Sequence, residues 1–261
     1  MKRRLLIAGL GAAAVVVGLT VLLVGTGAGT GSKASASNTI PGDHCNDLPG
    51  HEALKTALTD ARNENNGGFN LDMWGTVVNR DGVVCAVAFT GENRGEQWPG
   101  SRIISAQKAN TANAFSLPGL ALSTANLYTA VQPGNSLFGL QESNPVDTDA
   151  AYGGQARNYG QSNDPLVNEK IGGVNVFGGG LALYNSDGEL IGAVGVSGDS
   201  SCADHAIAWR TRNILELDYV PSGISGDAAR PDNIVYTAGP WEHPGCLDSD
   251  IDPSTLPETA L

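Results

Sequence analysis

The sequence predicts an α+β fold in which helices cover one antiparallel sheet. An apolar run, an Asn-x-Asp-Gly tetrapeptide and a second apolar run occupy residues 77–84, and the same pattern recurs at residues 183–190. Asp-Gly between apolar runs favours a tight hairpin turn, because Gly adopts positive φ without penalty and Asp bonds its own backbone. Each second run continues as an apolar strand and then as a helix-like segment. The identities are confined to the turn, so we interpret the repeat as shared architecture and leave gene duplication unproven.

The first helix and the first hairpin follow from the period of the apolar residues. Glu52–Asn65 places Ala and Leu at helical spacing and ends at Asn66-Gly67-Gly68. Strands are expected over Asn70–Arg80 and Val83–Phe89. A loop over Gly91–Gly100 then leads to the next helix.

Two more helices and a long loop are expected between the hairpins. The first helix covers Ser101–Leu117, where Ser101 can cap the start and Pro118-Gly119 ends the helix. The next covers Leu122–Val131. The Gly- and Asn-rich stretch Gln132–Gly173 follows, with few apolar residues at any period. Loops of this length inside a domain are usually functional or oligomer-forming.

The second hairpin and a closing helix complete the predicted domain. Strands are expected over Val174–Tyr184 and Leu190–Val196, followed by a helix over Cys202–Leu217. The tail Asp218–Leu261 carries Pro, Asp and Gly without clear periodicity. We therefore predict one domain at residues 39–217, with an inserted loop at 132–173 and a C-terminal tail at 218–261.

The first 38 residues resemble an export leader. Met1–Arg4 is basic, Leu5–Val24 is an apolar run of twenty residues, and Gly25–Asn38 is a spacer of small residues. Twenty apolar residues also suffice to span a bilayer, so an uncleaved N-terminal anchor is the alternative. We favour cleavage, and expect a secreted or extracytoplasmic protein, or one tethered to the membrane by residues 5–24.

Composition and cysteine content narrow the class of protein. The formal net charge is -12 and no basic stripe is present, which argues against a nucleic-acid partner. Four cysteines form an even set in an exported chain, so two disulfides are expected rather than a metal or catalytic site. Three pairings are open. We favour Cys45 with Cys85 and Cys202 with Cys246, because the second bond would pin the tail.

Three motifs resemble those of the GlcG/HbpS family of haem-binding proteins. They are Lys108-Ala109-x-Thr111-Ala112 within the helix that starts at Ser101, the triplet Gly178-Gly179-Gly180, and the run Gly188–Gly198. The resemblance implies a profilin-like domain, with a five-stranded antiparallel sheet, helices on both faces and assembly into a homo-oligomer. It also implies haem binding and, in some members, haem breakdown or iron sensing for a membrane kinase. The inserted loop, the cysteines and the tail are additions to the family core.

Haem bound noncovalently requires an apolar slot, an axial donor, and a cation or hydroxyl group near each propionate. His205 and His243 are the candidate axial donors. The alternative for His205 is a solvent-facing side chain beside a helix cap, and for His243 a rigid surface turn. The other two histidines, His44 and His51, lie at the start of the domain and are expected to be exposed.

Lys108, Thr111 and Phe115 share one face of the predicted helix. An ammonium and a hydroxyl group three residues apart could meet a propionate together, and Phe115 could form part of a haem wall. The structural alternatives are a snorkelling Lys, a Thr bonded to its own helix and a Phe in the core. No residue is assigned a catalytic role. Gly195-Val196-Ser197-Gly198 lacks the final Gly of a nucleophile elbow, and Asp248–Asp252 is followed by Pro253 where a calcium loop requires Gly.

We therefore expect an exported haem-binding protein that sequesters or senses haem or assists its degradation. A binding protein is favoured over an enzyme, and haem or a similar small ligand is the expected partner, with a membrane sensor as a second. The alternatives are an extracellular enzyme acting on a small metabolite such as a hydroxy acid, and a structural protein whose inserted loop builds an oligomer.

Overall fold

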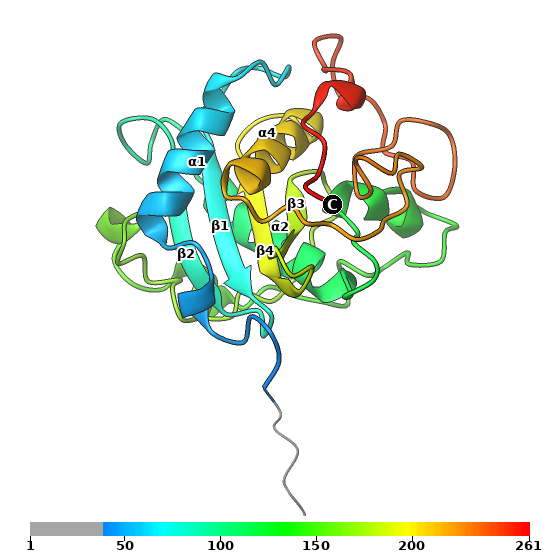
Figure 1. Cartoon of the computed structure of the whole chain (residues 1–261). Helices are drawn as coiled ribbons and strands as arrows, with labels where there is room; N and C mark the ends of the chain where they lie inside the picture. The colour runs from blue at the N-terminus through cyan, green and yellow to red at the C-terminus, as the bar shows by residue number, and fades with distance from the viewer. Residues whose placement is uncertain (1–38) are drawn as a thin grey trace, which may run out of the picture. The chain divides into compact units, whose positions relative to one another are not determined.

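A four-stranded antiparallel sheet lies at the centre of the computed structural model, which describes residues 39–261 (Figure 1). Its strand order is β2-β1-β4-β3, so the first strand of one hairpin pairs with the second strand of the other. The leader predicted at residues 1–38 lies outside the described residues. Within the described part of the chain, no helix combines the length and the apolar character needed to cross a membrane. The main elements are α1 (His51–Asn63), β1 (Trp74–Asn79), β2 (Val84–Phe89), α2 (Ser101–Phe115), α3 (Thr148–Tyr152), β3 (Gly180–Tyr184), β4 (Leu190–Ser197) and α4 (Ser201–Ile214).

Both predicted hairpins are confirmed, and their turns share one hydrogen-bond pattern. In the first turn Gly82 N donates to Asn79 O, and in the second Gly188 N donates to Asn185 O, each at 2.9 Å. Gly82 and Gly188 have φ values of 77° and 74°, the left-handed region that Gly adopts at low cost. The repeat in the sequence therefore encodes two equivalent turns of one sheet.

The fold class is α+β with an antiparallel sheet, as expected, but the expected fifth strand is wrong for the described residues. The chain does run beside the free edge of β2, where Val84 N donates to Glu169 O and Asn168 N donates to Val84 O, both at 2.9 Å. That pairing stops at an isolated bridge. Asn168, Gly172 and Gly173 have positive φ, and this conformation interrupts the extended backbone that a strand requires.

Helices cover both faces of the sheet (Figure 1). Helices α1 and α4 pack on one face, over a core that includes Leu54, Leu58, Val194 and Trp209. Helix α2 packs on the other face, over its own core cluster. The side chains of all four strands are almost entirely buried, as a sheet covered on both sides requires.

Helix α2 approaches the sheet closely because the strands beneath it carry glycine. A Cβ built on Gly195 of β4 would lie 1.9 Å from Ser105 O, and one on Gly180 would lie 2.4 Å from Lys108 O. The helix meets the sheet through small residues, including Ala106 and Ala109, which are fully buried. The glycines of two sequence motifs are thus explained by helix packing.

Two helix predictions need correction. Ser101 does not cap α2: Gly100 is the N-cap, and the Ser101 hydroxyl group accepts a hydrogen bond from Ser197 Oγ at 3.3 Å. The helix expected over Leu122–Val131 is two 3-10 turns, at Thr124–Leu127 and Thr129–Val131. The Asn126 side chain in the first turn donates to Asn233 O in the tail at 2.9 Å, which holds the segment in this short-turn geometry.

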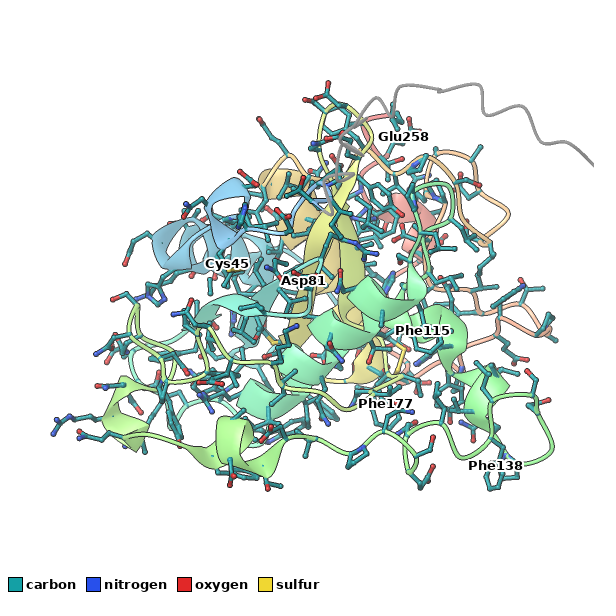
Figure 2. All side chains as sticks on the ribbon, turned by 90° about the horizontal axis from the view of Figure 1, so that it is seen from below. Cys45, Asp81, Phe115, Phe138, Phe177 and Glu258 are labelled. Atoms are coloured by element: carbon teal, nitrogen blue, oxygen red, sulfur yellow. A yellow bond between two sulfur atoms is a disulfide. The ribbon has the colours of Figure 1, made fainter. Side chains whose placement is uncertain are left out.

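The inserted segment, residues 132–173, contains the short helix α3 and a 3-10 turn at Ala156–Asn158. Asp147 caps α3 by accepting hydrogen bonds from Asp149 N and Ala150 N. Phe138 projects from the segment at the periphery of the molecule, and 65% of it is exposed (Figure 2).

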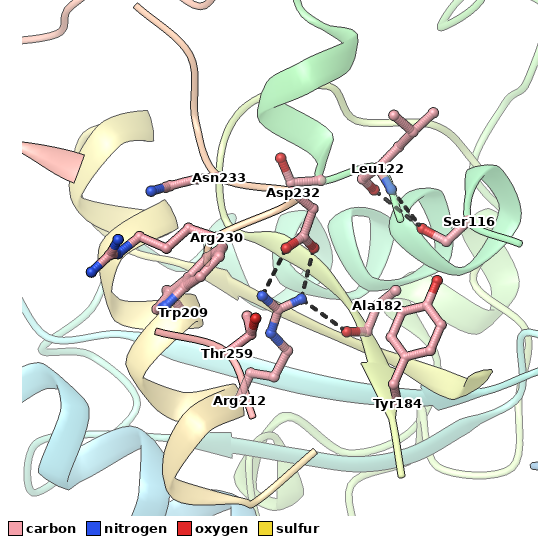
Figure 3. Close-up of polar contacts among 12 residues, drawn as sticks. Ser116, Leu122, Ala182, Tyr184, Trp209, Arg212, Arg230, Asp232, Asn233 and Thr259 are labelled. Carbon is pink, nitrogen blue, oxygen red and sulfur yellow. Dashed lines mark hydrogen bonds and ion pairs between the residues drawn. The ribbon is translucent and has the colours of Figure 1, made fainter. Parts of the chain in front are cut away.

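The tail, residues 218–261, lacks sequence periodicity but is packed against α4. Arg212 of α4 forms a buried two-point ion pair with Asp232, at 2.7 and 2.8 Å, and also donates to Ala182 O of β3 (Figure 3). The Cys202–Cys246 disulfide forms a second attachment, and Cys45–Cys85 joins the start of the domain to β2. Both bonds follow the favoured pairing, and they point to an oxidising, extracytoplasmic environment.

Candidate functional site

A cleft of about 580 Å³ lies beside the N-terminal end of α2. One wall belongs to the loop between β2 and α2, to α2 itself and to Trp74 of β1, and the opposite wall belongs to the inserted segment. Its volume lies within the range typical of small-molecule sites. We refer to it as the α2 cleft; its lining residues are Trp74, Asn93, Arg94, Gly95, Pro99, Gly100, Arg102, Ile103, Tyr152, Ala156 and Tyr159.

Arg102 joins the two walls of the α2 cleft. Its guanidinium forms a buried ion pair with Asp164 of the inserted segment, and its Nη1 donates to Ala151 O at 2.9 Å. The same group lies 3.8 Å from the centre of the Tyr159 ring, close enough for a cation–π interaction. Asp164 also accepts a hydrogen bond from Gly160 N. This network fixes the otherwise irregular segment against α2.

Two tyrosines of the inserted segment differ in their polar contacts. The Tyr159 hydroxyl group donates to the backbone oxygens of Tyr152 and Gly153, at 3.2 and 3.1 Å. Tyr152 is 69% exposed, and its hydroxyl group has no hydrogen-bond partner among residues 39–261. Tyr159 is therefore a wall residue, whereas Tyr152 offers a phenol that is free to bind a ligand.

Trp74, which lines the cleft, packs on a second aromatic residue behind it. Trp74 meets Phe89 edge to face, with ring centres 5.2 Å apart, and the Trp74 Nε1–H is buried without an acceptor in the described residues. Gly160 lies against both rings: an added Cβ would be 2.2 Å from Phe89 Cδ1 and 2.7 Å from Trp74 Cζ3. Its φ of 74° also favours glycine. The tight turn at Gly160 thus brings the inserted segment onto the aromatic pair.

The rim of the α2 cleft carries an unpaired cation. Arg94 is exposed and has neither an ion-pair nor a hydrogen-bond partner within the described chain. Noncovalent haem requires an apolar slot, an iron ligand, and a cation or hydroxyl group near each propionate. The cleft wall, the free phenol of Tyr152 and the guanidinium of Arg94 can supply the slot, the iron ligand and one propionate partner. The residues present therefore fit haem.

Lys108, by contrast, lies inside the protein. It is 1% exposed, and its Nζ donates to Asp204 Oδ2 at 2.6 Å and to Val196 O at 3.1 Å. Burial raises the pKa of Asp204 to about 6, against the opposing effect of the Lys108 charge. Lys108 is thus not the snorkelling surface residue considered above, and in this structure its charge is already paired.

Thr111 and Phe115 also make internal contacts. The Thr111 hydroxyl group donates to Gln107 O of its own helix at 2.8 Å, which confirms the helix-bonded Thr suggested by the sequence. It also accepts a hydrogen bond from Asn175 N at 2.9 Å. Phe115 is half-buried and packs against the cluster of Leu122, Leu127 and Val176. The shared role of Lys108, Thr111 and Phe115 at a propionate stays a prediction, and the structure does not bring them to the α2 cleft.

His205 is fully buried, so the solvent-facing alternative is wrong. Its Nε2 lies 3.1 Å from both Asn233 Oδ1 and Ile234 N, and its Nδ1 has no partner among the described residues. Burial lowers the pKa of His205 to about 4. The backbone of Gly178 passes close to the base of the His205 side chain, because a Cβ there would lie 3.0 Å from His205 Cβ. Chain atoms therefore occupy the space on that side of His205.

His243 is also buried, in the tail next to the Cys202–Cys246 disulfide. Its Nδ1 is 2.7 Å from Pro244 O, its Nε2 is 2.8 Å from Ser201 Oγ, and its ring centre is 4.9 Å from that of Tyr128. His205 and His243 as axial ligands stay predictions. Sequence reasoning overlooked Tyr152, Tyr159, Trp74 and Arg94; the available signal was two tyrosines in a segment otherwise poor in apolar residues.

Comparison with known proteins identifies the family. A family model described as haem degrading protein HbpS-like matches residues 51–212, which is more than half of the chain. A search of curated proteins finds no match.

Several solved structures match at low sequence identity, among them the following three. The Klebsiella pneumoniae protein ORFY is 23% identical, with a TM-score of 0.46, over 69% of this chain and 94% of its own. PduOC, solved as a haem complex, is 23% identical, with a TM-score of 0.46, over 66% of this chain and 98% of its own. HbpS is 17% identical, with a TM-score of 0.43, over 69% of this chain and 94% of its own.

Proposed function

The chain belongs to the HbpS-like family of haem-degrading proteins, and from this premise we propose that it is an exported protein that binds haem noncovalently in the α2 cleft. Family membership supports a role in haem binding or breakdown. The finer assignment, to sequestration or sensing of haem at this cleft, depends on the residues that line it.

Each lining group has a definite role in this proposal. Tyr152 would provide the axial oxygen, because a phenolate is an established protein ligand of haem iron. Tyr159 would contact a porphyrin face with aromatic surface, and the buried Trp74 ring would support this wall from behind. Arg94 would neutralise a propionate by a charge-assisted hydrogen bond. Bound haem would supply the iron chemistry, while the protein binds it, orients it and limits access of water.

One observation carries the proposal: the free phenol of Tyr152 stands at an aromatic cleft whose two walls are locked together by the Arg102–Asp164 ion pair. This ion pair matters because a ligand site formed by a long insertion binds more tightly when the insertion is already held in place. His205, His243 and Lys108 are buried and already have hydrogen-bond partners inside the protein, whereas Tyr152 and Arg94 are available without rearrangement.

A hemin titration followed by absorbance tests the proposal. We expect one saturable Soret shift in the wild type, at least tenfold weaker binding and an altered spectrum in Tyr152→Phe, and a smaller loss in Arg94→Ala. Tyr219→Phe, a change outside the cleft, is the matched control and should bind as the wild type does.

The same titration tests the other ligand candidates. His205→Ala, His243→Ala and Thr111→Ala should bind hemin normally provided that they fold. Loss of binding in a folded His243→Ala protein, with Tyr152→Phe unaffected, would transfer the site to the tail. No saturable spectral change in the wild type would overturn haem binding altogether.

The exposed aromatic residues of the inserted segment support assembly into a homo-oligomer. Phe138 and Tyr152 are 65% and 69% exposed, although large aromatic residues usually seek burial. Light scattering of Phe138→Ser should then report a smaller particle than the wild type, with an unchanged circular dichroism spectrum. An unchanged particle size would remove Phe138 from the interface.

A further inference from the structure

A second cluster of ligand-type side chains lies away from the α2 cleft, where the tail meets the start of α4. Cys202, His243 and Cys246 place their two Sγ atoms and a ring nitrogen within 4.8 Å of one another. Cys202 and His243 are buried, and Cys246 is half-buried. The two sulfurs form a disulfide with a Cα–Cα distance of 6.0 Å.

The hydrogen bonds of His243 define which of its ring nitrogens carries the proton. Its Nδ1 is 2.7 Å from Pro244 O, and a carbonyl oxygen can only accept, so Nδ1 carries the proton. In the neutral ring Nε2 then presents its lone pair, which accepts a hydrogen bond from the Ser201 hydroxyl group at 2.8 Å. A backbone carbonyl on the second nitrogen is the usual arrangement for a histidine that binds a metal.

The sulfur atoms have surroundings that suit thiolates. Cys202 lies in the first turn of α4, and Cys246 Sγ accepts a hydrogen bond from Cys202 N at 3.1 Å. Backbone N–H groups and the positive end of a helix lower the pKa of thiols. Cys246 is also anchored, since its N–H donates to Asp250 Oδ2 at 2.6 Å.

We propose that reduction of the Cys202–Cys246 disulfide creates a zinc site whose protein ligands are the two cysteine sulfurs and His243 Nε2. A dithiol supplies two electrons and two protons; the S–S bond breaks, two thiols form, and the dithiol becomes a disulfide. Zn²⁺ then replaces both thiol protons, which are released, as two Zn–S bonds and one Zn–N bond form. Two thiolates and one imidazole are a ligand set that tetrahedral zinc prefers.

Water would take the fourth position, or Asp250 after a movement of its side chain, because Asp250 lies outside the group of ligand atoms within 4.8 Å of one another. Asp250 Oδ1 is buried and has no hydrogen-bond partner among residues 39–261. Oxidation of the thiols back to the disulfide would expel the metal, because a disulfide sulfur is a far poorer ligand than a thiolate. The site is therefore metal-binding only in the reduced protein, and it is independent of the haem cleft.

Cobalt binding to the whole, haem-free protein tests the inference. Protein reduced with a dithiol, then freed of it under inert gas, is titrated with Co²⁺ and read by the sulfur-to-cobalt charge-transfer band. We expect one equivalent bound, displacement by Zn²⁺ and no band in the oxidised protein. The double variant Cys45→Ser/Cys85→Ser should keep the band, which assigns it to the other two sulfurs.

His243→Ala provides the decisive comparison, with His44→Ala at an exposed histidine as its matched control. We expect at least tenfold weaker Co²⁺ binding in His243→Ala and no change in His44→Ala. Equal binding in both variants, or no charge-transfer band in the reduced wild type, would overturn the proposal. If reduction alone unfolds the protein, Zn²⁺ must restore its circular dichroism signal, and failure to do so would equally overturn it.

Discussion

Lys108 illustrates, at the scale of the residue, how a charged side chain in a family motif can be used by the fold itself. Its ammonium is buried between Asp204 of α4 and the carbonyl oxygen of Val196 in β4, so one side chain of α2 reaches through the sheet to the opposite layer. Gly179 makes this route available, because a Cβ there would lie 3.2 Å from Lys108 Nζ. The spacing of the lysine and the glycines in these motifs is thus a packing requirement.

Lys108→Met should destabilise the protein strongly. Removing one partner of a buried ion pair leaves the other charge without compensation, which typically costs about 3–5 kcal/mol of unfolding free energy. Urea denaturation at pH 7.5 measures the loss, and Lys55→Met, at an exposed lysine of α1, should change stability by less than about 0.5 kcal/mol. Similar stabilities for the two variants would show that the ion pair is not structural.

At the scale of the element, helix α2 determines the position of the cleft relative to the sheet. It packs against β1, β3 and β4 through alanines and serines, and it carries the first wall of the α2 cleft at its N-terminal end. Its distance from the sheet is set by Gly195 and Gly180. Any side chain added at these glycines must move the helix, and with it the cleft.

Gly195→Ala should therefore destabilise the protein and weaken hemin binding together. The added Cβ would lie 1.9 Å from Ser105 O, and overpacking of this kind costs about 1–3 kcal/mol or more. Gly119→Ala, where no atom lies within 4 Å of the new Cβ, is the control. Thermal unfolding and the hemin titration give the two readouts. Normal stability in Gly195→Ala would mean that α2 can shift without cost.

The sequence predicted those helices and hairpins that are determined by residues close together in the chain. Asp81-Gly82 and Asp187-Gly188 define their turns within four residues, and apolar period places α1, α2 and α4 to within a few residues. The far wall of the cleft could not be predicted, because it depends on Arg102 meeting Asp164, residues separated by 62 positions in the chain. The packing of the tail depends equally on one distant pair, Arg212 with Asp232.

At the scale of the whole molecule, the tail packs over α4 and buries polar side chains that would otherwise be exposed to water. Asn233 and Ile234 of the tail cover His205, and the Arg212–Asp232 pair and the Cys202–Cys246 bond hold this cover in place. The described part of the chain is thus stabilised by contacts between residues that are far apart in the sequence. Its stability should respond to changes in the one histidine that these contacts enclose.

His205 should make the protein less stable as the pH falls. Its folded-state pKa of about 4 lies below the unfolded value of about 6.5, since its burial disfavours the charged ring and Nδ1 has no acceptor within the described chain. The unfolded state then binds more protons between these values, so stability is complete above pH 6.5 and is lost as the pH falls towards 4. The full effect is of order 3 kcal/mol.

Other groups titrate in the same range, so the test is the difference between two proteins. Asp204 acts in the opposite sense: its pKa is raised, and its contribution to stability falls as the pH rises through that range. Subtracting the urea stability of His205→Gln from that of the wild type at each pH cancels the Asp204 contribution, because both proteins contain Asp204. Gln does not titrate, and its amide can both donate and accept hydrogen bonds at this position. The difference should shrink by a few kcal/mol between pH 7 and pH 4.5. A difference that stays constant would place the acid sensitivity of the fold in groups other than His205.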